Sequence, residues 1–92
     1  MIVSFKCGET QSLLETGDSR RWNSGLRGAT RKLLMLHAAT ELRDLRSPPG
    51  NRLEQLLGNR AGQSSIRIND QWRICFIWTE AGPRDVEIVD YH

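Results

Sequence analysis

The chain has 92 residues, which is enough for one domain (1–92) with a modest hydrophobic core. Its hydrophobic fraction of 38% and charged fraction of 26% exclude an intrinsically disordered protein. The longest apolar run, ICFIW at 74–78, is too short to cross a membrane, and the first residues lack a signal-peptide pattern, so we expect a cytoplasmic protein.

The first half of the sequence predicts mainly helices. A short strand is expected at 2–5, a short helix at 8–17 and a longer helix at 26–39. The longer helix carries Leu26, Ala29, Leu33 and Leu36 at helical spacing. A further short helix is predicted at 40–45 with Thr40 as its N-cap, and the PPG sequence at 48–50 ends it.

The second half changes from helical spacing to alternation. Strands are predicted at 52–57, 64–69, 72–78 and 85–91, with turns between them. Alternation places Trp72, Ile74, Phe76 and Trp78 on one face, which we expect to pack against the helices. Helices followed by strands predict an α+β fold, in which an N-terminal strand and helices cover one face of a twisted, mostly antiparallel sheet.

Arginine dominates the basic residues, since Lys6 and Lys32 are the two lysines among thirteen lysines and arginines. A GC-rich genome would give the same bias, so the positions of the arginines have to decide. Arg67 and Arg73 are predicted on neighbouring strands, on the face away from the helices, with no obvious carboxylate partner. The pair suits a phosphate clamp, and the alternative is an ordinary solvated sheet face.

The last predicted strand leads into Tyr91 and His92. If this strand pairs with 72–78, its end approaches Arg73. Arginine, tyrosine and histidine together suit RNA cleavage: histidine titrates near neutrality, arginine stabilises charge on the phosphate, and tyrosine stacks on a base. This chemistry needs no metal and no cofactor. His37, by contrast, lies on the helix at 26–39, far from the arginines in sequence, and we expect it to be structural or exposed.

The two cysteines, Cys7 and Cys75, lack the CxxC spacing and neighbouring histidines of a zinc site. In a cytoplasmic chain we expect two free thiols. A disulfide between them is the alternative that the sequence leaves open.

Four stretches of the chain resemble one known family. SIRINDQWRICF, the final VEIVDYH, TELRDLRSPPGNRLE and the opening MIVSF resemble the HigB-type toxins of the RelE-like superfamily. The resemblance implies a RelE-like fold and a metal-independent endoribonuclease that cleaves mRNA in the ribosomal A site. It also implies a helix-turn-helix antitoxin of the HigA type, with which the toxin binds operator DNA, and a bacterial cytoplasmic location.

The resemblance also implies roles for individual residues. The DYH motif falls on Asp90, Tyr91 and His92, with His92 as general acid or base, Tyr91 stacking on or orienting the RNA, and Asp90 orienting its neighbours. The three arginines implied in binding RNA or phosphate are Arg60, Arg67 and Arg73; Arg73 is also counted among the catalytic residues.

The chain departs from the family pattern near Arg60. Leu57 stands where many relatives have lysine, Asn59 where they have aspartate, and Ser64 where many have a large aromatic residue or histidine. Loss of the lysine removes a phosphate contact or a candidate base. Two other interpretations therefore stay open: a weak or degenerate toxin that still binds its antitoxin, and a gyrase-poisoning toxin of the ParE type, against which the DYH motif argues.

Overall fold

A computed structural model describes residues 1–22, 26 and 28–90 of the protein. The helical elements are α1 (Gly8–Thr16), α2 (Ala29–Ala38) and the 3-10 helices η1 (Leu42–Arg46), η2 (Pro49–Asn51) and η3 (Gly58–Arg60). The strands are β1 (Glu54–Gln55), β2 (Ser64–Arg67), β3 (Trp72–Thr79) and β4 (Gly82–Asp90). None of the described helices has the length and hydrophobicity needed to cross a membrane.

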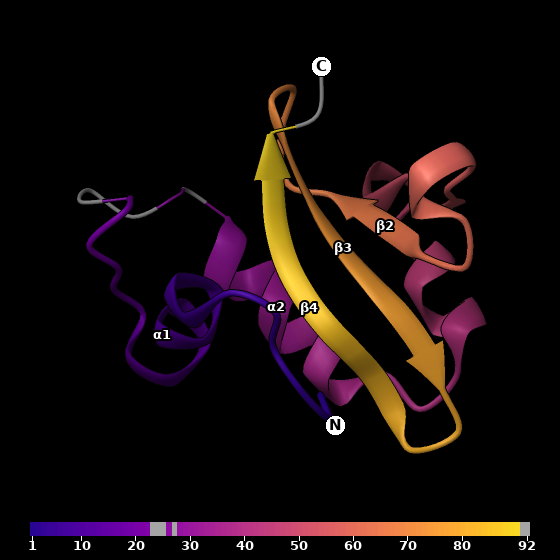
Figure 1. Ribbon diagram of the computed structural model, residues 1–92, viewed down its shortest axis with the longest axis horizontal. Helices are drawn as coiled ribbons and strands as arrows, with labels where there is room; N and C mark the ends of the chain where they lie inside the picture. Colours follow the sequence, from indigo (N-terminus) through magenta and orange to yellow (C-terminus); the bar gives the residue numbers. More distant parts are fainter. Residues whose placement is uncertain (23–25, 27, 91–92) are drawn as a thin grey trace.

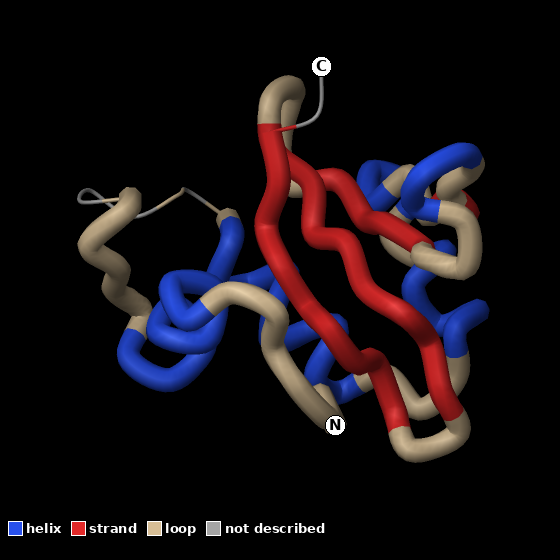
Figure 2. Tube along the Cα trace, in the orientation of Figure 1, coloured by secondary structure: helices blue, strands red, loops and turns tan. Residues whose placement is uncertain are grey.

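In the described part of the chain, the strands form one antiparallel sheet in the order β1-β2-β3-β4. Figure 1 shows α2 passing behind β4, with α1 beside that strand. The 3-10 helices gather near β2, at the other edge of the sheet (Figure 2). The predicted α+β architecture is therefore confirmed.

The core forms where α1 and α2 meet one face of β3 and β4. Ile74 and Phe76 of β3 are fully buried there, as are Leu33 and Leu36 of α2. Trp72 and Trp78 are partly buried and pack against the same cluster, as the alternation of β3 predicts. Because apolar burial is the main stabilising term in folding, this contact fixes the orientation of the sheet and of its opposite face.

The opening segment differs from the strand predicted at 2–5. It runs beside β4, where Val3 N–H donates to the Pro83 carbonyl at 2.7 Å and Val86 N–H donates to the Ser4 carbonyl at 3.1 Å. Instead of a regular strand ladder, the opening segment forms with β4 an isolated parallel bridge between Phe5 and Val86. Asp85 explains the interruption, because its left-handed conformation (φ 52°) bends β4 between the two bonded positions.

Two other predicted elements are shorter or tighter than expected. The helix predicted at 40–45 is the 3-10 helix η1, and its N-cap is Glu41 rather than Thr40. Asp44 accounts for this start, because its carboxylate accepts the backbone N–H groups of Glu41 and Thr40, which also lowers its pKa. Of the strand predicted at 52–57, Glu54–Gln55 is β1, since Arg52 before it is left-handed (φ 45°).

The two cysteines are free thiols, as expected. Cys75 is buried in β3, and its burial raises the pKa of the thiol. It is therefore protonated and unreactive at neutral pH.

Gly82 provides a test of how the opening segment docks. Its φ is 127°, and a Cβ built on it would lie 2.2 Å from the Met1 carbonyl oxygen. Gly82→Ala should therefore lower the free energy of unfolding in urea by about 1–3 kcal/mol, through backbone strain and displacement of the segment. Gly50→Ala is the matched control, because that site is open and lacks a positive φ. An equal effect of the two substitutions would contradict this explanation.

Candidate active site

Arg67 and Arg73 lie directly opposite each other on β2 and β3, as predicted. Together with Arg52, Asn69 and Asp70 they line a cavity of about 260 Å³. Three arginines around one small cavity give a site suited to a phosphate group, because the planar guanidinium forms paired hydrogen bonds with phosphate oxygens.

Arg73 is buried rather than exposed, with 8% of its surface accessible. Its Nε donates to Ser65 Oγ at 2.8 Å, and its Nη2 donates to the Arg52 carbonyl at 2.6 Å and the Ser65 carbonyl at 3.3 Å. A carboxylate is also present, since Glu54 Oε1 lies 3.9 Å from Arg73 Nε. The predicted solvent face is thus covered at Arg73, where the Arg52 carbonyl, in the turn before β1, contacts the guanidinium.

Arg67 is more accessible, with 30% of its side chain exposed. Its Nη2 contacts the carboxylate of Asp70, which is itself almost fully exposed. The expectation that this arginine lacks an acidic partner is therefore wrong. An ion pair this exposed contributes little to stability, so an incoming phosphate can displace Asp70 at small cost.

Arg52 is a site residue that the sequence analysis missed. It follows η2, its backbone is left-handed, and its carbonyl accepts a hydrogen bond from Arg73. The residue also lines the cavity. Its place in a turn after PPG gives no periodic signal, so strand and helix patterns could not reveal it.

Arg60 lies on η3, where its Nη1 donates to Glu87 of β4 at 2.9 Å and to Gln63 at 3.2 Å. Lys6 approaches the same Glu87 carboxylate at 3.8 Å. Arg60 is not among the described residues that line the cavity between Arg67 and Arg73. Its first role is to fasten the η3 loop to β4, and 36% of its side chain remains exposed.

The three departures from the family pattern lie on or near the η3 loop. Leu57 is 87% exposed and lines a separate cavity together with Ser64, a residue that is itself 5% exposed. Asn59 is exposed within η3. Neither Leu57 nor Ser64 is among the described residues around the arginine cavity.

Asp90 ends β4 directly opposite Trp72, and Gln71 Nε2 donates to its carboxylate at 3.1 Å. The neighbouring register pair is Val89 with Arg73, so the end of β4 lies beside the arginine cavity as predicted. The other two residues of the motif, Tyr91 and His92, lie outside the described residues.

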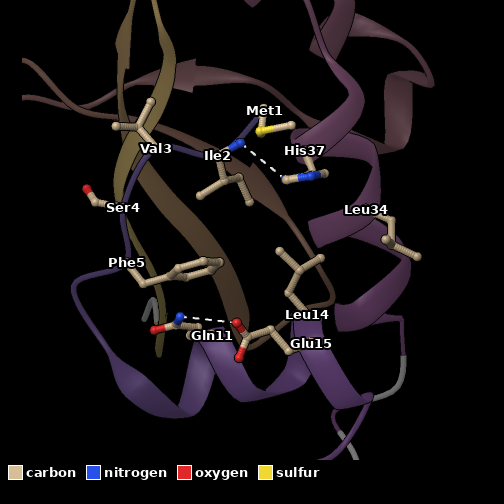
Figure 3. Close-up of a pocket in the computed structure, with 10 residues that line it drawn as sticks. All are labelled: Met1, Ile2, Val3, Ser4, Phe5, Gln11, Leu14, Glu15, Leu34 and His37. Carbon is tan, nitrogen blue, oxygen red and sulfur yellow. Dashed lines mark hydrogen bonds between the residues drawn. The ribbon is translucent and has the colours of Figure 1, made fainter.

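A larger cavity, of about 600 Å³, lies between the opening segment, α1 and α2 (Figure 3). His37 accepts a hydrogen bond from Ile2 N–H at 3.1 Å on its wall, and Gln11 donates to Glu15 at 3.2 Å. The remaining lining is mostly apolar. His37 is therefore structural, which is one of the two roles expected for it. Among the described residues, this cavity lacks the clustered cations of the arginine site.

Comparison with known proteins assigns the chain to a family. The family model described as "RelE-like toxin of type II toxin-antitoxin system HigB" matches residues 4–92. The chain belongs to the HigB family of RelE-like toxins.

Two curated proteins are similar to this HigB-family chain. Toxin HigB-1 of Vibrio cholerae serotype O1 is 54% identical over 50 residues, which cover 54% of the chain and 53% of that toxin. An uncharacterized protein of Haemophilus influenzae is 46% identical over 46 residues, which cover 50% of the chain and 46% of that protein. The chain thus spans about half the length of the curated relatives it matches.

The burial of Arg73 predicts a structural cost for its removal. Arg73→Ala leaves the Ser65 hydroxyl and the Arg52 carbonyl without their donor, and should lower the free energy of unfolding by about 1–3 kcal/mol. Arg67→Ala, the matched arginine on β2, should cost less than about 1 kcal/mol because its ion pair is exposed. Urea denaturation followed by circular dichroism measures both values. Equal losses for the two variants would show that the buried contacts of Arg73 contribute nothing.

Proposed function

We propose that this HigB-family toxin is a ribosome-dependent endoribonuclease that cleaves mRNA in the A site and stops translation in the bacterial cytoplasm. The observation that carries the proposal is the cavity lined by Arg52, Arg67 and Arg73 at the end of β4. Family membership supports it, because RelE-like HigB toxins as a class are endoribonucleases.

The arginine cavity fits the scissile phosphate of RNA. In such a reaction the 2′-oxygen attacks phosphorus, negative charge grows on the non-bridging oxygens, and the 5′-oxygen leaves. Preorganised guanidinium groups stabilise that charge best when they are fixed before the substrate arrives. Arg73 meets this condition through its bonds to Ser65 and the Arg52 carbonyl, whereas Arg67 would exchange Asp70 for the phosphate.

The DYH motif supplies the proton-transfer group in this proposal. Asp90 lies opposite Trp72, next to the Val89–Arg73 pair, and Tyr91 and His92 follow it in the sequence. His92 would act as general acid or base, Tyr91 would stack on or orient a base, and Asp90 would orient both. No step requires a metal or a cofactor.

Arg60 would contact the RNA backbone at the rim of the site. Its ion pair with Glu87 holds the η3 loop against β4, and its exposed portion can still meet a phosphate. The mRNA would thus pass from the η3 loop to the arginine cavity.

Substitution of His92 tests the catalytic part of the proposal. General acid–base groups contribute typically 10²–10⁴-fold in rate, so His92→Gln should lower cleavage of ribosome-bound mRNA by about that factor. Its melting temperature should match that of the wild type. Primer extension on translated mRNA gives the cleavage positions and the rate.

His37→Ala serves as the control histidine. It loses the bond to Ile2 N–H and should lower stability while leaving mRNA cleavage intact. Full cleavage by His92→Gln would place the proton transfer elsewhere. Growth arrest without mRNA cleavage but with gyrase-dependent DNA damage would indicate a ParE-type toxin. Antitoxin binding without growth arrest would indicate a degenerate toxin.

The partner can be tested separately from catalysis. We expect a helix-turn-helix antitoxin of the HigA type to form a complex with this toxin and to bring it to their own promoter. With a net charge of only +2, the toxin has little electrostatic attraction for DNA, so the antitoxin should supply the DNA contacts. Gel-shift assays should show promoter binding by the complex. Specific promoter binding by the toxin alone would contradict this division.

A further inference from the structure

Asn51 is a fully buried polar residue to which the sequence analysis gave no role. It ends η2, and none of its surface is accessible. A buried amide is tolerated when its donors and its acceptor are bonded within the protein. Its Nδ2 donates to the Leu45 carbonyl at 3.0 Å and to the Ser47 carbonyl at 3.4 Å. Its Oδ1 accepts a hydrogen bond from Lys32 Nζ, so one side chain joins η2 to both η1 and α2.

The contacts of Asn51 with α2 connect it to the core. Lys32 is followed by Leu33, which is fully buried in the main hydrophobic cluster. Burial lowers the pKa of the Lys32 ammonium, and the charge of Arg31 lowers it further, so this cation is partly withdrawn from water. On the next turn of α2, Met35 Sδ lies 3.1 Å from Asn51 Nδ2. A helix that the core holds in place thus determines the position of the Asn51 amide.

The next residue, Arg52, carries this constraint to the arginine cavity. Its backbone is left-handed (φ 45°), and its N–H donates to the Pro49 carbonyl at 3.1 Å. A residue other than glycine keeps this conformation only where its surroundings impose it. The Arg52 carbonyl accepts the hydrogen bond from Arg73 Nη2 at 2.6 Å. A displacement of Asn51 would therefore move an acceptor that orients the Arg73 guanidinium.

The acceptors of Arg73 come from two different parts of the fold. The hydroxyl and the carbonyl of Ser65, at 2.8 Å and 3.3 Å, belong to β2 and are placed by the register of the sheet. The Arg52 carbonyl makes the shortest of these three contacts and belongs to the turn before β1. The orientation of the guanidinium thus depends on how that turn is held, as well as on the sheet.

We propose that Asn51 is a positioning residue of the arginine cavity, because it holds the Arg52 carbonyl where that carbonyl fixes the guanidinium of Arg73. Asn51 is not among the described residues that line the cavity, so it acts through Arg73 rather than on the ligand. Its effect on catalysis rests on the proposed ribonuclease function, in which the Arg73 guanidinium meets the scissile phosphate.

Asn51→Asp tests this proposal with a small change in shape. Aspartate keeps an oxygen that can accept from Lys32 Nζ. It also replaces the amide donor by a second oxygen, which faces the carbonyls of Leu45 and Ser47 and cannot bond to them. The η2 turn should move away from these carbonyls, and the Arg52 carbonyl should move with it.

Nuclear magnetic resonance of the arginine Nε–H groups measures the effect on Arg73 without a substrate. The signal that disappears in Arg73→Lys is the signal of Arg73. Because hydrogen-bonded groups exchange slowly with water, Asn51→Asp should speed hydrogen exchange at this Nε by about tenfold or more. His37→Ala is the control, since it loses a hydrogen bond far from the cavity and should leave this exchange unchanged.

Cleavage of ribosome-bound mRNA gives a second measurement. Misplacement of a group by about 1 Å costs on the order of 10²-fold in rate, so Asn51→Asp should lower the maximal single-turnover rate by about that factor. The ribosome concentration that gives half of the maximal rate should change less than about threefold, because the loss falls on the transition state. His37→Ala should keep both values of the wild type.

Double variants show whether Asn51 acts through Arg73. Added to Arg73→Lys, Asn51→Asp should lower the maximal rate by less than about threefold, because the oriented guanidinium is already absent. Added to Arg67→Ala, it should keep its full effect, since Arg67 contacts Asp70 rather than the Arg52 carbonyl.

Three results would overturn the role of Asn51. They are unchanged exchange at Arg73 in a folded Asn51→Asp, equal acceleration of that exchange in His37→Ala, and an equal loss of cleavage rate with and without Arg73. If Asn51→Asp fails to fold, Lys32→Met decides, because it removes the donor to Asn51 Oδ1 and keeps a long side chain. Faster exchange at Arg73 in that variant supports the proposal, and unchanged exchange overturns it.

The proposed function can fail separately from this inference. Absence of mRNA cleavage by the wild type overturns the ribonuclease proposal. The exchange rate at Arg73 then still decides whether Asn51 positions the guanidinium.

Discussion

The candidate site depends on the buried guanidinium of Arg73. A cation removed from water is tolerated only where hydrogen bonds replace its hydration. Ser65 of β2 and the carbonyl of Arg52 provide these bonds, so a single side chain of β3 ties together a neighbouring strand and the turn that leads into β1. The left-handed backbone of Arg52 belongs to the same arrangement, because it directs its carbonyl towards the guanidinium.

The three arginines therefore have different roles. Arg73 is oriented by protein acceptors before any ligand binds, so little reorganisation is needed when charge develops beside it. Arg67 and Arg52 are closer to solvent, and they can adjust to the ligand. Burial of the Arg73 guanidinium is offset by its hydrogen bonds to Ser65 and the Arg52 carbonyl. Removal of Arg73 is therefore expected to affect both structure and function.

The alternation of β3 predicted the core face correctly, because burial against α2 imposes a two-residue period on Ile74 and Phe76. The same alternation could not show that Arg73 on the opposite face is covered, since the Arg52 carbonyl that contacts it belongs to a turn whose sequence has no period. Arg52 was missed for that reason, and the carboxylates near Arg67 and Arg73 were overlooked because Asp70 and Glu54 belong to a turn and a two-residue strand. The resemblance to HigB toxins supplied the family, which no pattern of hydrophobic residues reveals.

The order of strands in the sheet has a kinetic consequence. Each strand pairs with its neighbour in sequence, so the ladder from β1 to β4 can form through short hairpin closures. The contacts that join the opening half to the sheet span far more of the chain, as in the bond from Ile88 N–H to Thr10 Oγ1 and that from Asp85 N–H to Ser4 Oγ. Closing long loops carries a larger entropy cost and slows folding. The rate at which this protein folds should therefore be set by docking of the helices onto a sheet that assembles locally.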